Sequence, residues 1–86
     1  MNLNIQDKVY IVTGGSKGIG EGITRAIADE GGTVVIATRS EGVTQDLAKA
    51  LNEKGKKVDY IIGDLQDLNH CKKVIEFTIE KFGRID

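Results

Sequence analysis

Residues 9–20 read VYIVTGGSKGIG, and this stretch decides the fold. It begins with four β-branched or aromatic residues, which are typical of a strand buried on both faces of a parallel sheet. Gly14, Gly18 and Gly20 then permit a sharp turn, the close approach of a ligand to the backbone, and close packing of a helix on the sheet. A Cβ would hinder all of these, so we predict a strand, a glycine-rich turn and a helix.

Apolar residues continue past the turn at helical spacing, at Ile19, Ile23, Ala26 and Ile27. The unpaired N–H groups and the dipole at the start of such a helix attract a phosphate. We therefore expect the turn to bind an anionic ligand. The candidate binding residues of this stretch are Gly14, Ser16, Lys17, Gly18, Ile19 and Gly20.

The rest of the chain repeats the alternation of strand and helix. Glycines at 31–32 end the first helix, and the apolar run 34–37 predicts a second strand. A second helix should then present Val43, Leu47, Ala50 and Leu51 on its apolar face, ending near Gly55.

Residues 58–62 predict a third strand, which ends at Gly63 and Asp64. Asp67 is a good N-cap for a third helix. Its expected buried face consists of Cys71, Val74, Ile75, Thr78, Ile79 and Phe82. The resulting order βαβαβα predicts an α/β fold, the N-terminal half of a doubly wound, Rossmann-like parallel sheet.

Composition narrows the possible partners. The 86 residues contain 12 Lys plus Arg and 13 Asp plus Glu, for a net charge of -1 and no basic block, so we expect no nucleic acid and no membrane partner. No apolar run approaches the ~18 residues of a membrane span. Residues 1–8 lack the features of a signal peptide, which favours the cytoplasm. With His70 and Cys71 as the only residues of their types, we predict helix packing for both and no metal site.

The glycine spacing selects among phosphate-binding loops. A Walker A loop is excluded, because Glu21 rather than Lys follows Gly20. The dinucleotide pattern G-x-G-x-x-G is also absent. The observed pattern, T-G-x-x-x-G-x-G from Thr13, resembles that of the short-chain dehydrogenase/reductase family. The resemblance implies an oxidoreductase that transfers a hydride between a nicotinamide dinucleotide and an alcohol or carbonyl substrate, within a homo-oligomer.

The resemblance also implies that residues 1–86 are an incomplete domain, the N-terminal part of a family member. The phrase KFGRID at residues 81–86 leads, in relatives, into a fourth strand, with the catalytic Ser and a Tyr-x-x-x-Lys pair farther on. Tyr10 and Tyr60 are followed four residues later by Gly14 and Asp64, not Lys. We thus expect no catalytic residue in this chain. The alternative is a non-catalytic dinucleotide-binding module or a truncated, inactive product.

The residues after the second strand suggest which dinucleotide binds. An acidic residue there would bond the ribose of NAD, whereas a cation suits the 2'-phosphate of NADP. The chain has Thr38, Arg39 and Ser40, with Lys17 in the glycine turn, so NADP is favoured over NAD. Glu41 weakens this preference, and the two cations could instead be solvated surface charges.

Three finer expectations remain. Asp64 and Leu65 match the family's Asp-Leu pair, which the resemblance implies holds the adenine ring; Asp64 could instead only cap a turn. Ser16 could hold the ribose or phosphates, or be a tolerated turn residue. The start MNLNIQDKV, with LQD at residues 65–67, Cys71 and the ending FGRID, also looks like the L-fucose (aldose) dehydrogenase branch of the family.

Overall fold

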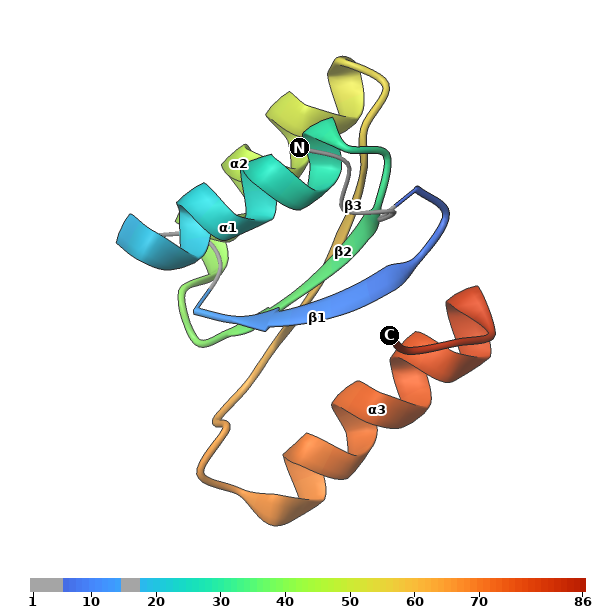
Figure 1. The fold of residues 1–86 in the computed structure, drawn as a ribbon. Coiled ribbons are helices and arrows are strands. Elements are labelled where there is room, and N and C mark those ends of the chain that lie inside the picture. The colour runs from blue at the N-terminus through green and yellow to red at the C-terminus, as the bar shows by residue number, and fades with distance from the viewer. Residues whose placement is uncertain (1–5, 15–17) are drawn as a thin grey trace.

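The computed structural model describes residues 6–14 and 18–86. Its elements alternate as the sequence predicts: β1 (Val9–Thr13), α1 (Gly18–Asp29), β2 (Thr33–Thr38), α2 (Glu41–Glu53), β3 (Lys57–Ile62) and α3 (Leu68–Phe82). The predicted α/β class with the order βαβαβα is confirmed (Figure 1).

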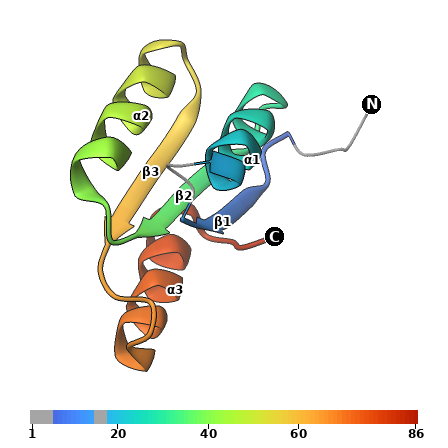
Figure 2. The ribbon, with the colours of Figure 1, turned by 90° about the vertical axis from the view of Figure 1, so that its left-hand side faces the viewer.

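The three strands form a parallel sheet in the order β1-β2-β3. Every residue of β2 is buried, as expected for the central strand of a sheet covered on both faces. Figures 1 and 2 place α1 and α2 on one face of the sheet and α3 on the other. This is the layered arrangement of a doubly wound fold.

The main core lies between the sheet and the helices α1 and α2. Its buried members come from both layers: Ala28, Val34, Ile36, Leu47, Ala48, Leu51 and Val58. Because side chains of a strand alternate between faces, Val35 and Ala37 point to the opposite face, where α3 contributes the buried Val74. The sheet thus has an apolar layer on each side.

The helices bury a narrower face than the apolar pattern predicts. Ile75 and Ile79 were expected in the buried face of α3 but are 47% and 50% exposed, and on α2 Val43 and Ala50 are exposed. On α1, Ile23 is 47% exposed. These side chains lie on helix faces that the described elements cover only in part.

Threonines occupy several of the buried helix positions instead. Thr24, Thr44 and Thr78 are fully buried. The Thr44 hydroxyl donates to the Ser40 carbonyl, and that of Thr78 donates to the Val74 carbonyl at 2.8 Å. A threonine that bonds the carbonyl one turn earlier can be buried without an unpaired hydroxyl. Thr24 and Thr44 were therefore missed by a pattern that counts threonine as polar.

The helix ends follow the sequence. The Asp67 carboxylate accepts a bond from the Asn69 N–H at 2.9 Å, which confirms it as the N-cap of α3. Gly31, two residues past the end of α1, has φ +88°, a left-handed conformation that favours glycine. Within the described ranges, no helix is long and apolar enough to cross a membrane.

Candidate functional site

The ends of the three parallel strands meet at one edge of the sheet, where α1 also begins (Figure 1). The Gly14 N–H after β1 donates to the Ala37 carbonyl of β2 at 2.9 Å. The Gly63 N–H after β3 donates to the Thr38 carbonyl at 3.0 Å. These two bonds hold the three strand ends at one level. In open α/β sheets, ligands bind outside this carboxyl edge.

Gly14 and Gly18 flank the turn between β1 and α1 in left-handed conformations, with φ of +62° and +53°. A Cβ added to either would meet no atom of the described residues within 4 Å. Glycine is therefore required here by the backbone conformation, and the space above the two residues is open. Such a cradle fits a phosphate group approaching the backbone.

The structure describes only some of the other candidate residues of this stretch. Ser16 and Lys17 lie outside the described residues. Ile19 stands in the first turn of α1, but its side chain is 85% exposed and does not join the core. Gly20 follows it in the same turn. The structure thus brings Gly14, Ile19 and the neighbouring glycines to one helix start.

At the end of β2, the side chains separate into a buried and an exposed group. Thr38 is buried, and its hydroxyl oxygen accepts a bond from the Ser40 N–H at 3.2 Å. Arg39 is exposed at the site edge. Ser40 is the N-cap residue of α2, yet its side chain makes no capping bond. The guanidinium and the Ser40 hydroxyl are therefore available to a ligand.

At the end of β3, Asp64 is exposed and its Oδ1 accepts a bond from the Gln66 N–H at 2.9 Å. The turn-capping role is therefore present in the structure. It does not exclude a ligand, because a carboxylate has a second oxygen that can accept a bond. Leu65 is half-buried, and its carbonyl accepts from the Cys71 thiol at 3.1 Å.

Two cavities lie near the sheet. An apolar one of about 160 Å³ separates α3 from the carboxyl half of the sheet, lined by Ile11, Thr13, Ala37, Leu65, Cys71, Val74 and Ile75. The Cys71 side chain belongs to this packing layer, as predicted from its place on the helix.

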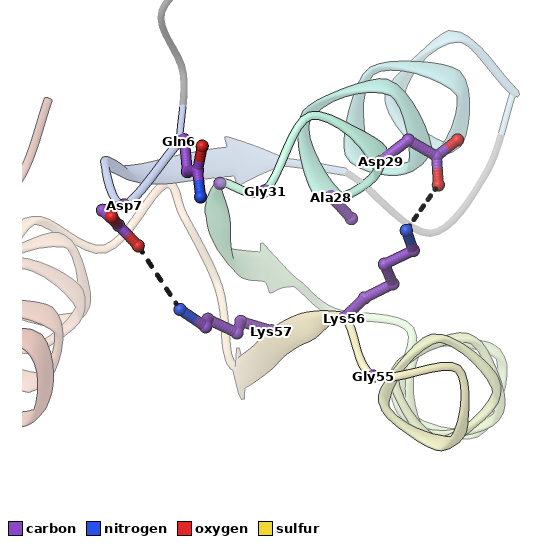
Figure 3. Close-up of a pocket in the computed structure, with 9 residues that line it drawn as sticks. Gln6, Asp7, Ala28, Asp29, Gly31, Gly55, Lys56 and Lys57 are labelled. Carbon is purple, nitrogen blue, oxygen red and sulfur yellow. Dashed lines mark ion pairs between the residues drawn. The ribbon is translucent and has the colours of Figure 1, made fainter.

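The other cavity, of about 170 Å³, lies at the opposite, amino end of the strands. Lys56 pairs with Asp29 and Lys57 pairs with Asp7, with N–O distances of 3.6 Å in both pairs (Figure 3). Each lysine is thus matched by its own carboxylate, which argues against an anion site there. Within the described ranges, no group of three or more His, Cys, Asp or Glu side chains could hold a metal ion.

Charge interactions also mark the start of β1. The Asp86 carboxylate pairs with the Arg84 guanidinium at 2.6 Å and accepts the Val9 N–H at 3.0 Å. These bonds, that to Arg84 first, lower the pKa of Asp86, and the same pair raises the pKa of Arg84. Both groups stand at the other end of β1 from the candidate site.

Sequence reasoning missed the contact that Gly63 makes. It identified Gly63 only as the end of a strand, whereas the structure places the His70 ring directly against it. The sequence feature that could have drawn attention to this contact is the position of Gly63 immediately before Asp64, a candidate ligand-binding residue.

Known proteins are similar to this chain in both sequence and fold. Residues 8–86 match the family model described as short chain dehydrogenase. The chain is 38% identical over 81 residues to the 7alpha-hydroxysteroid dehydrogenase of Bacteroides fragilis, covering 94% of this chain and 31% of that protein. It is 33% identical over 82 residues to an A-factor type gamma-butyrolactone 1'-reductase of Streptomyces virginiae, covering 95% and 32%.

Among solved structures, L-sorbose reductase from Gluconobacter frateurii, complexed with NADPH and L-sorbose, superposes with a TM-score of 0.92 and 32% identity. The match covers 100% of this chain and 33% of that protein. The chain therefore spans about a third of the length of the relatives that it matches.

Proposed function

The chain belongs to the short chain dehydrogenase family, and we propose that it forms the cofactor-binding, N-terminal part of an NADP(H)-dependent oxidoreductase. Such an enzyme transfers a hydride between the nicotinamide and an alcohol or carbonyl substrate. The observation that carries the proposal is the pair of left-handed glycines, Gly14 and Gly18, at the start of a helix on the carboxyl edge of a parallel sheet.

Each part of this edge has a role in binding the dinucleotide. The start of α1, with Gly14, Ser16, Gly18, Ile19 and Gly20, would hold the pyrophosphate through backbone N–H groups and the helix dipole. The cofactor supplies the hydride-transfer chemistry when bound. This chain's own residues bind and orient it.

The adenosine half would lie across the ends of β2 and β3. There, Arg39 and Ser40 face the ribose, while Asp64 and Leu65 face the adenine, the carboxylate as hydrogen-bond acceptor. The chain therefore binds and orients the cofactor, and we assign it no catalytic residue.

The groups at the end of β2 favour NADP(H) over NAD(H). Thr38 is neutral, and its hydroxyl already accepts the Ser40 N–H. Arg39 is an exposed cation with the fork geometry that suits a phosphate, and Lys17 would add a second positive charge. Glu41 accepts a bond from Gln45 at 3.2 Å, which directs its carboxylate along α2. One solved relative is named as an NADPH complex.

The outer edge of β1 supports the proposal that the domain is incomplete, whereas the outer edge of β3 is closed. Along β3, the Asn52 side chain pairs with the backbone of Val58, accepting its N–H at 3.0 Å and donating to its carbonyl at 2.8 Å. This side chain occupies an edge that another strand would otherwise use. Along β1, the Val9 carbonyl instead accepts the backbone N–H of Asp86 at 2.7 Å. That bond is the start of a strand-like pairing beyond β1.

For the substrate, we propose an alcohol or carbonyl compound, with an aldose as the narrower candidate. The narrower candidate rests on the resemblance to the L-fucose dehydrogenase branch. One solved relative is named for a different kind of sugar, the ketose L-sorbose. Other relatives are named for a hydroxysteroid and a butyrolactone. The competing proposal is a dinucleotide-binding module without catalysis, which the absence of a Tyr-x-x-x-Lys pair in this sequence favours. Reading the gene beyond Asp86 for that pair in frame distinguishes the two.

The cofactor assignment is tested by Arg39→Ala in the complete protein that carries this chain. A lost charge-assisted bond should weaken NADP(H) binding by about ten- to hundred-fold, while NAD(H) binding changes little. Dissociation constants from fluorescence titration of both cofactors give the ratio. Arg25→Ala, on the exposed face of α1, is the matched control. Equal losses for the two cofactors, or a preference of the unsubstituted protein for NAD(H), would refute the assignment.

A further inference from the structure

The His70 side chain, in the first turn of α3, packs against the backbone of Gly63. A Cβ on Gly63 would lie 2.2 Å from His70 Cε1 and 2.3 Å from Nε2. Real Cβ atoms do not approach other atoms so closely, so the imidazole occupies the space that any other residue at position 63 would need. A residue with a Cβ at position 63 would therefore have to displace the His70 ring, whereas the φ of Gly63 itself is not left-handed.

The ring is also held at an energetic disadvantage. His70 Nε2 is buried and has no hydrogen-bond partner among residues 6–14 and 18–86. A buried polar atom without a partner destabilises the folded state relative to an apolar side chain of the same shape. A phenylalanine would fill the same space without this disadvantage, so the shape of the ring, and not its nitrogen, is what acts on Gly63.

Gly63 lies between the His70 ring and the two parts of the proposed adenosine site, which are the end of β2 and the Asp64 turn. Its N–H donates to the Thr38 carbonyl at 3.0 Å, immediately before Arg39. Its carboxyl side leads directly to Asp64, whose carboxylate closes the following turn on Gln66. A shift of Gly63 would therefore displace both the end of β2 and the Asp64 turn. Figure 1 shows the long connection between β3 and α3 that this contact fixes.

We propose that His70 is a positioning residue for the adenosine half of the dinucleotide: its ring, seated on Gly63, sets the relative placement of Asp64 and Arg39. The proposal rests on the proposed function, since it assigns those two residues to the cofactor. His70 does not contact the cofactor itself in this account. It acts through the Gly63 backbone.

The test compares four forms of the complete protein carrying this chain: unsubstituted, His70→Ala, Gly63→Ala, and the double variant. The readouts are the dissociation constant for NADP(H), the melting temperature without cofactor, and KM and kcat where activity is present. His70→Ala frees the turn and should raise the dissociation constant by about ten-fold. Gly63→Ala should do the same through the clash. Lys72→Ala, exposed on the same helix, is the matched control.

The double variant decides between positioning and general destabilisation. Removing the ring makes room for the new Cβ, so the double variant should lose no more NADP(H) affinity than His70→Ala alone, about ten-fold rather than the hundred-fold of two independent losses. In the active enzyme, KM for NADP(H) should rise in His70→Ala while kcat stays unchanged. His70→Phe fills the same space and should keep the affinity of the unsubstituted protein.

Three results would overturn the proposal. Unchanged NADP(H) affinity in both single variants removes the positioning role and leaves the proposed function intact. Losses that simply add in the double variant, with a matching fall in melting temperature, indicate a structural contact only. Absence of dinucleotide binding by the unsubstituted protein refutes the proposed function and this inference together.

Discussion

At the scale of single residues, Gly18 shows how a side chain's absence can be a requirement. Its φ of +53° is strained for any residue with a Cβ, and for a β-branched residue it is an outlier. Gly18→Val should therefore reshape the start of α1 and abolish measurable NADP(H) binding by the complete protein. Titration of NADP(H) fluorescence measures this. Gly22→Val is the control, because Gly22 lies in the same helix with open space and no left-handed φ.

Retained binding by the Gly18 variant would show that the glycine turn only connects β1 to α1. The space at Gly14 and Gly18 sharpens this test, since a Cβ added at either position would meet no atom of the described residues within 4 Å. Any loss of affinity must then come from the backbone or from direct crowding of the ligand. A lower melting temperature of the variant without cofactor would indicate the backbone effect. An unchanged melting temperature would indicate crowding of the ligand.

Residue-scale reasoning from the sequence brought the candidate residues to one edge of the sheet but missed contacts that hold them there. Arg39 and Asp64 could be placed together because the carboxyl ends of parallel strands share one edge. The contact of His70 with Gly63 could not, because it depends on the path of the chain between residues 63 and 70. The sequence pattern gives no measure of that path.

At the scale of elements, the strands and helices were predictable because apolar runs alternate with turn residues along the chain. The faces of the helices were less so. Thr24 and Thr44 are buried, although their hydroxyls made them polar in the pattern. Ile75 and Ile79 are partly exposed because the described elements cover their side of α3 only in part. Periodicity identifies an apolar face but not which part of that face is covered.

The contacts at the start of β1 predict how the protection of the Val9 amide from hydrogen exchange depends on pH. The Arg84 pair and the Val9 N–H lower the pKa of Asp86 below its ordinary 3.8, so the folded form binds this proton less readily than the unfolded one. The contact is therefore fully present above about pH 4 and is lost as the pH falls through the lowered pKa. Hydrogen exchange at the Val9 amide should accelerate in that range, beyond its intrinsic pH dependence.

Two comparisons make this measurement specific. The Thr33 amide, which donates to the Lys8 carbonyl at 2.8 Å, has no carboxylate partner and should keep its protection. Arg84→Gln removes the largest cause of the shift, so the loss of protection at Val9 should begin at a higher pH. An unchanged midpoint in that variant would contradict the assigned cause.

At the scale of the whole molecule, the structure combines a well-formed sheet with incomplete cover. The buried β2 and the clamp of Asn52 on Val58 finish one side of the fold. On the other side, the contact that the described residues make along the outer edge of β1 is that of Asp86 with Val9, at the start of the strand. Because alternate residues of a parallel strand face the same edge, the N–H and C=O groups of Ile11 face outward as well. Such an edge is a template for pairing with another chain.

These features predict how the 86-residue polypeptide behaves by itself. The β1 edge and the partly exposed Ile75 and Ile79 should make it marginally stable or self-associating. We expect weak NADP(H) binding and no dehydrogenase activity, since the sequence has no Tyr-x-x-x-Lys pair. Sedimentation and thermal melting test this, with Ile75→Glu and Ile79→Glu expected to reduce association and Lys72→Glu as the control. A soluble monomer with a cooperative transition would mean that three strands and three helices suffice, and that the β1 edge is not a site of association.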